Sequence, residues 1–373
     1  MTRKAEATAN STTRGNSQLR SLRAHIDKLD LHILKLLNER ADLAAEAGRI
    51  KMEHGGEVFS PAREEEVLQN VVASNKGPLD EATVRAIFRE LMSGSRALQR
   101  LLKVAYLGPE YSFSHLAAVE RFGQAVEFMR VGSIGAVFEE VNRGHADFGV
   151  VPLESTPEGR VADTLDMFLR LPQLKIGAEV RLQVHHHLLA NCEQQEIRRV
   201  YGRSQILAQC RNWLSKNVPH ASLHEVASTA TAAELAQREP GAAAVANRHA
   251  AVRYGLRILF EDIEDSPYTE TRFAVIGTQQ SDRSGDDKTA VMFRIAHEPG
   301  ALAGILSIFK QVKLNLTWIE SFPVRPARPE YVFFVDFEGH LEDPKVKRAI
   351  GLLKDHCEEV MVLGSFPSAS ISG

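Results

Sequence analysis

The feature that most constrains this chain is a long apolar stripe near its start. From Leu19 to Ile50, apolar residues recur every three or four positions, the spacing of one face of an α-helix. The stripe predicts one helix of about thirty residues, much longer than the globular mean, ending at Gly55-Gly56. Its members are Leu19, Leu22, Ile26, Leu29, Ile33, Leu36, Leu43, Ala47 and Ile50.

Two shorter helices are predicted after it. Ser60-Pro61 suits a helix start, with serine as N-cap and proline at the first helical position. A third helix is expected after Asp80. Residues 17–102 thus read as an all-α domain, preceded by a polar tail at 1–16 that we expect to be disordered. Three helices make a thin core for about 85 residues, so burial by dimerisation is a natural remedy.

The pattern changes at Lys103. Short apolar runs alternate with helical patterns through residues 103–278, which predicts an α/β domain. Residues 279–287 are a polar linker, and 288–367 read strand, helix, strand, strand, helix, strand, the α+β ferredoxin-like order, before a short tail at 368–373. The chain is therefore expected to be multidomain.

Composition excludes several classes. A net charge of −3 gives no electrostatic reason to expect nucleic-acid or membrane binding. No run of about 18 apolar residues is long enough to span a membrane. The three cysteines, Cys192, Cys210 and Cys357, are widely spaced, which argues against a disulfide framework and favours the cytoplasm.

One charge lies on the apolar face of the first helix. The heptad register through Ile26 and Ile33 reaches Arg40, and a buried guanidinium needs an anionic partner. Arg40 either pairs with a neighbouring glutamate or snorkels out at a helix edge, or it binds a ligand. Arg23 lies seventeen residues earlier, roughly 25 Å along a helix. If both arginines hold one small ligand, Arg23 must come from a second copy.

With these residues in view, Gln18–Leu101 resembles the all-helical chorismate mutases. The resemblance implies catalytic roles for seven residues, with the first arginine crossing over in an intertwined dimer: Arg23, Arg40, Lys51, Arg63, Glu64, Ser95 and Gln99. The arginines would hold the two carboxylates, Lys51 and Gln99 the ether oxygen, and Glu64 the ring hydroxyl. The departure is Ser60, where the family often has an acidic residue.

Three motifs mark the middle segment: Gly108-Pro109 to Ser114, Val151-Pro152 to Gly159, and Thr271-Arg272-Phe273. Each alone is ordinary turn or cap chemistry, with Ser114 a plausible cap. Together they resemble the two-lobed prephenate dehydratases, which implies Thr271 as the catalytic donor. The implied substrate-binding residues are Ser114, Glu154, Ser155, Thr156, Gln205, Ser228, Thr229, Arg272 and Phe273. Arg272 would hold a carboxylate or brace the site. The departures are Tyr111, Ser112, Ser155, Thr156, Pro157, Gly202, Arg203 and Thr269.

The run His185-His186-His187 invites a metal interpretation, but no nearby carboxylate or cysteine is expected to complete a ligand set. No metal is therefore expected. Cys210 is interpreted as a buried small residue rather than a nucleophile.

The last segment resembles the ACT domains of bacterial dehydratases. The residues that carry the resemblance, and that it implies as an allosteric site for L-phenylalanine at a dimer interface, are Gly300, Ala301, Leu302, Asn315, Leu316, Glu320 and Ser321. Phe322 stands where an arginine is usual.

The three resemblances imply a bifunctional enzyme of phenylalanine biosynthesis, an isomerase and a carbon–oxygen lyase, acting on chorismate and prephenate as a homo-oligomer without a cofactor. Two alternatives stay open. One is an amino-acid-sensing binding protein, which explains the last two segments but not Arg40. The other is an active mutase with a weakened or arogenate-preferring dehydratase.

Overall fold

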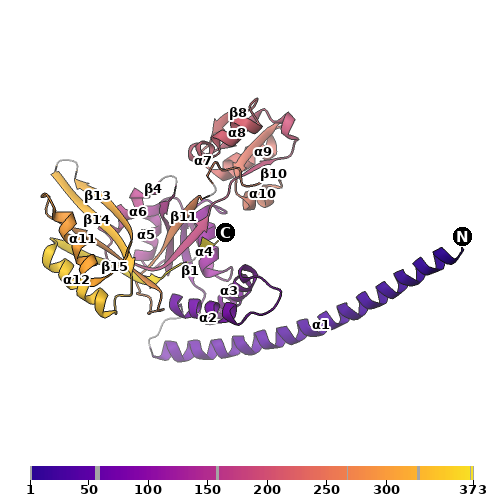
Figure 1. Ribbon diagram of the computed structural model, residues 1–373, viewed down its shortest axis with the longest axis horizontal. Coiled ribbons are helices and arrows are strands. Elements are labelled where there is room, and N and C mark those ends of the chain that lie inside the picture. Colours follow the sequence, from indigo (N-terminus) through magenta and orange to yellow (C-terminus); the bar gives the residue numbers. More distant parts are fainter. Residues whose placement is uncertain are drawn as a thin grey trace.

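The computed structural model describes residues 2–54, 59–156, 159–266, 268–325, 328–369 and 371–372. Three parts follow one another along the chain: a group of helices, an α/β region with two sheets, and a C-terminal sheet covered by two helices (Figure 1). The predicted multidomain order is confirmed at this level.

The helical part consists of α1 (Thr2–Glu53), α2 (Pro61–Ser74) and α3 (Glu81–Ala97). Both predicted helix starts are confirmed: Ser60 Oγ accepts a hydrogen bond from the backbone N–H of Arg63 at 3.4 Å, and Asp80 caps α3. The predicted stop at Gly55-Gly56 lies outside the described residues. α1 begins at Thr2, where a disordered tail was predicted; no proline interrupts residues 2–16.

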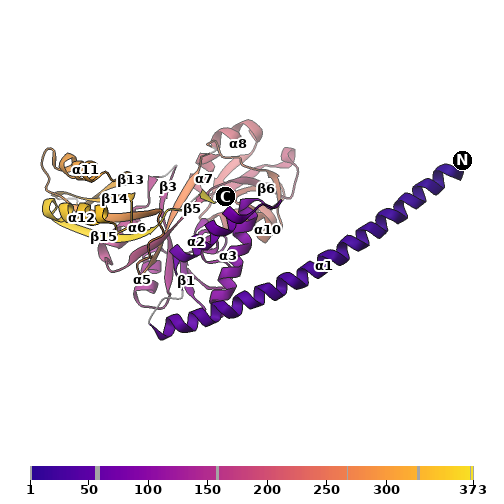
Figure 2. The same ribbon diagram turned by 60° about the horizontal axis from the view of Figure 1, so that its bottom comes forward.

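α1 projects away from the body of the molecule, and its N-terminal end lies far from every other element (Figures 1 and 2). The apolar stripe is consequently exposed: Leu22 is 63% exposed, Ile33 52% and Leu43 67%. An exposed apolar seam of this length has no covering partner among the described residues of this chain.

The first α/β sheet has the order β16-β5-β11-β3-β1-β2, with β4 paired to β3. Its strands are β1 (Lys103–Leu107), β2 (Glu127–Val131), β3 (Phe148–Ser155), β4 (Gly159–Arg160), β5 (Lys175–Gln183), β11 (Glu270–Gly277) and β16 (Ile371–Ser372). Its helices are α4 (Phe113–Phe122), α5 (Ile134–Asn142) and α6 (Ala162–Arg170). β16 adds a C-terminal strand where only a tail was expected.

The second sheet has the order β10-β6-β9-β7-β8. Its strands are β6 (His187–Ala190), β7 (Arg199–Gly202), β8 (Ser222–Glu225), β9 (Ala242–Ala246) and β10 (Arg257–Phe260). They pack with η1 (Gln194–Glu196), α7 (Ser204–Gln209), α8 (Arg211–Asn217), α9 (Thr229–Arg238) and α10 (Arg248–Tyr254). The chain enters this lobe after β5 and returns before β11, so two crossing segments join the lobes (Figure 1).

The C-terminal part follows the predicted strand–helix–strand–strand–helix–strand order. It comprises β12 (Asp287–Arg294), α11 (Ala301–Val312), β13 (Leu316–Arg325), β14 (Arg328–Glu338), α12 (Pro344–His356) and β15 (Glu359–Pro367). The antiparallel sheet has the order β13-β14-β12-β15. α11 and α12 cover one face, and Met292 and Phe334 on the other face join the core of the first α/β sheet.

The C-terminal sheet abuts β5 closely. A Cβ built on Gly364 of β15 would lie 2.2 Å from the Ile176 carbonyl oxygen, so only glycine permits this approach. Lys175 Nζ donates to the Val362 carbonyl at 2.8 Å across the same junction. The two parts are therefore packed backbone to backbone.

Among the helices in the described ranges, none combines the length and the apolar character that a membrane crossing requires.

Candidate active sites

The helical part brings Arg40, Ser95 and Gln99 together. Arg40 Nη1 of α1 donates to Ser95 Oγ of α3 at 3.1 Å, and Gln99 Nε2, just beyond the end of α3, donates to the Ala44 carbonyl of α1 at 2.9 Å. Gly48 makes room for this contact, because a Cβ built there would lie 2.2 Å from Gln99 Oε1.

Arg40 has no carboxylate partner among the described residues. Partial burial lowers the pKa of its guanidinium, and its recorded partner is a hydroxyl rather than a neighbouring glutamate. A half-buried cation with one neutral partner leaves donors free for an anion. The geometry thus favours the ligand-binding interpretation of Arg40.

The other predicted mutase residues do not join this group. Arg63 Nη1 pairs with Glu66 at 2.7 Å. Glu64 pairs with Arg96 of α3 and, at 3.7 Å, with Arg121 of α4. In the described part of the chain, the side chains of Arg23 and Lys51 make no ion pair, and both are exposed.

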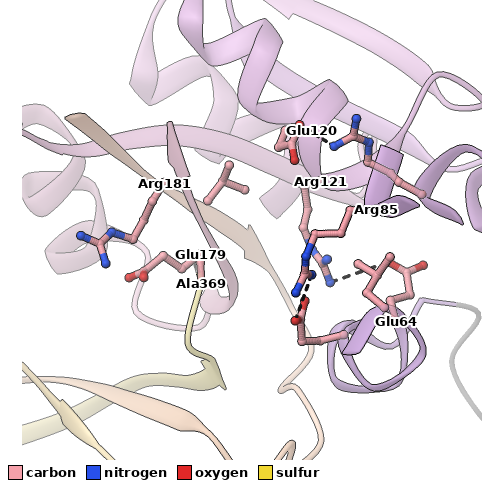
Figure 3. A pocket seen from close by; sticks show the side chains of 11 residues that line it. Glu64, Arg85, Glu120, Arg121, Glu179, Arg181 and Ala369 are labelled. Carbon is pink, nitrogen blue, oxygen red and sulfur yellow. Dashed lines mark hydrogen bonds and ion pairs between the residues drawn. The ribbon is translucent and has the colours of Figure 1, made fainter. Parts of the chain in front are cut away.

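Glu64 belongs to a cluster of interleaved charges where the helical part meets the first sheet (Figure 3). A cavity of about 90 Å³ there is lined by Glu64, Glu65, Arg85, Arg89, Glu120, Arg121, Glu179 and Arg181, with Leu68, Val180 and Ala369. Arg85 pairs with Glu65 at 3.4 Å, and Arg89 pairs with Glu120 at 2.5 Å. Because acids and bases balance, the cluster is a structural junction rather than an anion site.

In the first sheet, Thr271 and Ser155 lie opposite each other on β11 and β3. The two predicted hydroxyls are thus on adjacent strands of the first lobe. The second lobe contacts the first through Asn247 at the start of α10, whose Nδ2 donates to the Tyr111 carbonyl at 2.9 Å.

Several predicted substrate residues have structural contacts instead. Ser112, not Ser114, caps α4, because its Oγ accepts from the His115 N–H. Thr156 Oγ1 donates to the Glu270 carbonyl at 3.1 Å. Phe273 is 1% exposed and packs in the apolar core, so its predicted contact with substrate is wrong; the alternation of β11 sends it inward.

The second lobe holds the remaining predicted residues. Ser228 caps α9 by accepting from the Thr231 N–H at 3.0 Å, and Thr229 begins that helix. Gln205 is an exposed residue of α7. Cys210 is buried, and burial raises the pKa of its thiol, which agrees with a packing role.

Arg272 and Glu154 face the C-terminal sheet. Arg272 is 7% exposed, and its guanidinium bonds to Glu179 of β5 and Asp336 of β14. Burial raises the pKa of Glu154, and the positive charge of Arg272 offsets this in part. Of the two predicted roles for Arg272, a brace rather than a substrate clamp fits these contacts.

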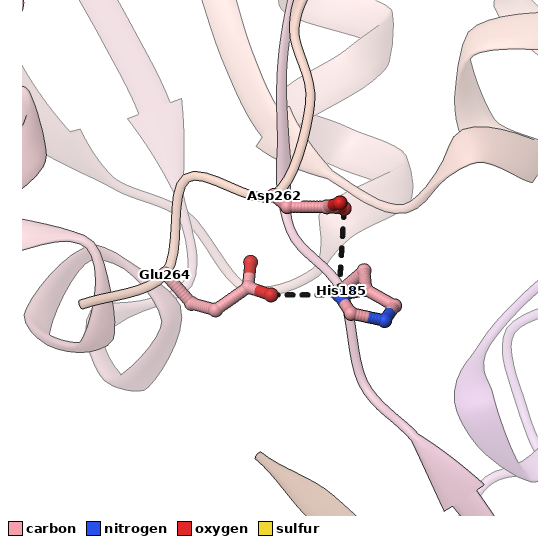
Figure 4. A group of neighbouring side chains, drawn as sticks. All are labelled: His185, Asp262 and Glu264. Atoms are coloured by element: carbon pink, nitrogen blue, oxygen red, sulfur yellow. Dashed lines mark hydrogen bonds and ion pairs between the residues drawn. The ribbon is translucent and has the colours of Figure 1, made fainter. Parts of the chain in front are cut away.

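The segments that join the lobes carry the histidine run (Figure 4). His185 Nδ1 lies 2.7 Å from Glu264 and 3.4 Å from Asp262. The prediction that no carboxylate completes a set with His185 is wrong, because the two acids come from the distant return segment. The other Glu264 oxygen accepts from the His186 N–H at 2.9 Å. A separation of 2.7 Å is that of a hydrogen bond, so these residues tie the two segments together.

A cavity of about 260 Å³ opens in the C-terminal part. Its lining comprises Ile295, Ala296, His297, Glu298, Ala301, Leu302, Ser321, Tyr331 and Phe333. Ala301, Leu302 and Ser321 were predicted, and Gly300 precedes them as the N-cap of α11, with φ 87°. Asn315 bonds to Glu338, Glu320 pairs with Arg160, and Leu316 packs in the core, so these three do not line it.

Four residues that contact or line these sites were not predicted from the sequence: Glu179, Asp336, Asn247 and His297. Glu179 lies between Ala178 and Val180 of β5, and Asp336 lies between Val335 and Phe337 of β14. A charge in a buried strand needs a partner, and that pattern was the available signal. Asn247 and His297 carry no comparable signal.

Two family models match the chain. Chorismate mutase type II matches residues 22–100, and prephenate dehydratase matches residues 104–281. The bifunctional chorismate mutase/prephenate dehydratase of Pseudomonas aeruginosa is 42% identical over 359 residues, covering 94% of this chain and 98% of that protein. The protein of the same description from Aquifex aeolicus is 42% identical over 357 residues, with the same coverage. This chain belongs to the bifunctional chorismate mutase/prephenate dehydratase family.

Solved structures agree with this membership for the dehydratase and C-terminal parts. A prephenate dehydratase from Arthrobacter aurescens, crystallised in complex with L-Phe, is 31% identical with a TM-score of 0.67. The match covers 72% of this chain and 90% of that one. Within the family, the Arg40 group lies in the mutase region and the Thr271 group in the dehydratase region.

Proposed function

We propose that this chain catalyses two consecutive steps of phenylalanine biosynthesis and that L-phenylalanine feeds back on the second. The mutase region rearranges chorismate to prephenate. The dehydratase region removes water and CO₂ from prephenate to give phenylpyruvate. The observation that carries the proposal is the coexistence of the Arg40–Ser95–Gln99 group and the Thr271–Ser155 pair in one chain of this family.

The mutase step is a unimolecular pericyclic rearrangement, which needs no nucleophile or cofactor. The site has to hold the compact conformer of a dicarboxylate and stabilise charge on the breaking ether oxygen. Arg40 holds one carboxylate, and Gln99 turns from the Ala44 carbonyl toward the ether oxygen, with Lys51 as the second donor. Arg63 and Glu64 remain part of the proposal, although they would first have to leave Glu66 and the arginines that they contact here.

A second copy of the chain completes this site. The exposed seam of α1 supports a dimer, because burying it removes a large apolar surface from water. Arg23 and Arg40 are roughly 25 Å apart on one helix. Arg23 therefore acts in the site of the partner copy.

The dehydratase step removes a ring hydroxyl and a carboxylate from prephenate. The leaving hydroxyl takes a proton and departs as water, while the carboxylate departs as CO₂. Thr271 is the donor to the leaving oxygen, with Ser155 beside it. Ser114, Thr156, Gln205, Ser228 and Thr229 hold the substrate, and Glu154 and Arg272 set the position of the strands that carry the hydroxyls.

The C-terminal part is an ACT domain that binds L-phenylalanine. The cavity beside α11 has the apolar and aromatic lining that a phenyl ring requires, and His297 and Ser321 supply polar groups for its charged end. The L-Phe complex of the Arthrobacter dehydratase supports the ligand. Asn315, Leu316 and Glu320 take part through the second copy or through strand packing.

The test is a product analysis with the parent chain. Incubation with chorismate alone should give prephenate first and phenylpyruvate later. A chain that binds L-phenylalanine but leaves chorismate unchanged would instead be an amino-acid-sensing binding protein, the alternative that the sequence did not exclude.

A further inference from the structure

Arg272 is the neighbour of the proposed donor Thr271, yet its side chain reaches another domain. Successive residues of a strand point to opposite faces of a sheet, so the two side chains leave β11 in opposite directions. Arg272 Nε donates to Glu179 of β5, and its Nη2 donates to Asp336 of β14. One guanidinium thus joins the dehydratase sheet to the C-terminal sheet.

The contact is buried and its charges are matched. Glu179 is 5% exposed and Asp336 1%. Lys288 Nζ donates to the second oxygen of Glu179 at 3.1 Å, and the guanidinium lies 5.4 Å from the ring of Trp318 on β13. Arg272 therefore faces two buried anions, and losing its contact with Asp336 would leave that buried carboxylate without its cation.

The two C-terminal strands that contact Arg272, β13 and β14, also line the C-terminal cavity. Trp318 and Asp336 are register partners, as are Ser321 and Phe333 of the cavity. The two pairs are three residues apart along the ribbon, about 10 Å. Because three is odd, the cavity lies on the helix-covered face and the Arg272 contact lies on the face toward the dehydratase.

We propose that Arg272 is a positioning residue through which L-phenylalanine in the C-terminal cavity displaces Thr271. The inference rests on the regulatory function proposed above and assigns its route. A ligand that moves β13 and β14 changes the fit of Asp336 to the guanidinium. Arg272 follows that change, and the adjoining backbone of β11 carries Thr271 with it.

The two carboxylates that contact Arg272 belong to different domains. Glu179 lies on β5, the strand paired with β11 in the dehydratase sheet, and it also bonds to Lys288. Asp336 lies on β14 of the C-terminal sheet, and Arg272 is the cation that it pairs with among the described residues. Asp336 is therefore the partner of Arg272 that moves with the C-terminal sheet.

The experiment compares Asp336→Asn with Arg160→Gln in the full chain. Arg160 of β4 forms a separate polar link to β13, a more exposed pair with Glu320 at 3.0 Å, so its loss controls for a weakened interface. For each protein, L-phenylalanine binding is measured by calorimetry and the half-inhibiting concentration by the dehydratase assay. Each rate is normalised to that protein's own uninhibited rate.

We expect Asp336→Asn to bind L-phenylalanine within about threefold of the parent while its half-inhibiting concentration rises at least about tenfold, within the usual range of coupling. Arg160→Gln should match the parent in both. If L-phenylalanine inhibits Asp336→Asn as strongly as the parent, the route through Arg272 is overturned but the regulatory function is not. The same holds if Asp336→Asn no longer binds L-phenylalanine. A parent chain that neither binds nor responds overturns the regulatory function as well.

Hydrogen exchange of the parent chain tests the same route even if Asp336→Asn does not fold. L-phenylalanine should change exchange at the amides of Thr271 to Phe273 on β11 as well as around the cavity. Exchange that changes around the cavity but not on β11, in a chain that L-phenylalanine inhibits, would contradict the route through Arg272.

Discussion

At the scale of single residues, the two proposed sites use different chemistry. The mutase group relies on Arg40, a cation on the apolar face of α1, and on Gln99, whose side-chain amide donates to the Ala44 carbonyl of the same helix. The dehydratase group relies on hydroxyls on adjacent strands, Thr271 and Ser155. Each site should therefore fail through a different kind of substitution.

Arg40→Ala should lower mutase activity roughly 10- to 150-fold, because a hydrogen bond to a charged group contributes about 1.5–3 kcal/mol. Dehydratase activity on supplied prephenate should survive. The measurement is the initial rate of chorismate loss, with circular dichroism as the folding control. Chorismate turnover within threefold of the parent would refute the assignment of Arg40.

Gly48→Ala tests the room that α1 leaves for Gln99. The added methyl group would collide with the end of a flexible side chain, so the helix should form normally, and alanine is the better helix former. We expect at least about a tenfold loss of mutase rate, which corresponds to about 1.4 kcal/mol of lost transition-state stabilisation, with the melting temperature unchanged. Gly351→Ala, where nothing lies within 4 Å, is the matched control. Equal rates in the two variants would show that Gln99 does not depend on Gly48.

Glu179 predicts a pH dependence of stability. Its folded pKa lies below its usual value, so the stability that its charge contributes is present above the unfolded value of about 4.3 and is lost as pH falls through the folded pKa. Glu179→Gln should lower the melting temperature at pH 7, by an amount that narrows below about pH 4.3. Melting curves from pH 7 to 3.5 test this, and a gap that widens on acidification would contradict the sign.

At the scale of elements, α1 is the helix whose apolar face is not covered by the described residues of the chain. Its apolar stripe is exposed along the projecting helix, while the turns from Arg40 to Gly48 contact α3 and the adjoining Gln99. The exposed stripe and the distance between Arg23 and Arg40 both favour a partner helix. Complementation between an Arg23 variant and an Arg40 variant separates a contribution of Arg23 to the partner's site from a structural role of Arg23.

Arg23→Ala and Arg40→Ala should complement each other. Each variant alone should have little mutase activity, but a refolded mixture should recover part of it, because one site of a mixed dimer keeps both arginines. Differently tagged chains allow the mixed dimer to be purified before the assay. Absence of recovery from purified mixed dimers would mean that Arg23 serves its own chain or only the fold.

Local pattern was sufficient to predict several elements. The strand and helix order of the C-terminal part follows from apolar spacing, and the caps of α2 and α3 follow from Ser60 and Asp80. β16 and the meeting of His185 with Glu264 could not be predicted, because they join residues far apart in the sequence. In the same way, Arg40 was identifiable from its register, whereas the engagement of Arg272 by Asp336 depends on how two sheets pack.

At the scale of the whole molecule, ion pairs join all three parts. Arg121 of α4 meets Glu64 of the mutase helices, and Asp336 of the C-terminal sheet meets Arg272 of the dehydratase sheet. The dehydratase region thus contacts both neighbours through charges close to the proposed sites. A regulatory ligand can act on the dehydratase without touching its substrate.

L-phenylalanine should bind the parent chain and inhibit the dehydratase, even though Phe322 stands where the resemblance expects arginine. Gly300→Val should weaken binding at least about fivefold, because Gly300 has a φ of 87° that a β-branched residue rarely adopts. Calorimetry beside the dehydratase assay measures both effects. Binding without inhibition would show an uncoupled site, and no heat at millimolar ligand would leave the domain a role in assembly only.

The most direct test of two separate sites in one chain is a time course of chorismate, prephenate and phenylpyruvate with Thr271→Val. Valine is nearly isosteric with threonine and removes only the hydroxyl. We predict that chorismate disappears at the parent rate while prephenate accumulates and phenylpyruvate does not form. Phenylpyruvate at the parent rate would make Thr271 a structural strand residue. Loss of both steps in a folded protein would contradict the separation of the two sites.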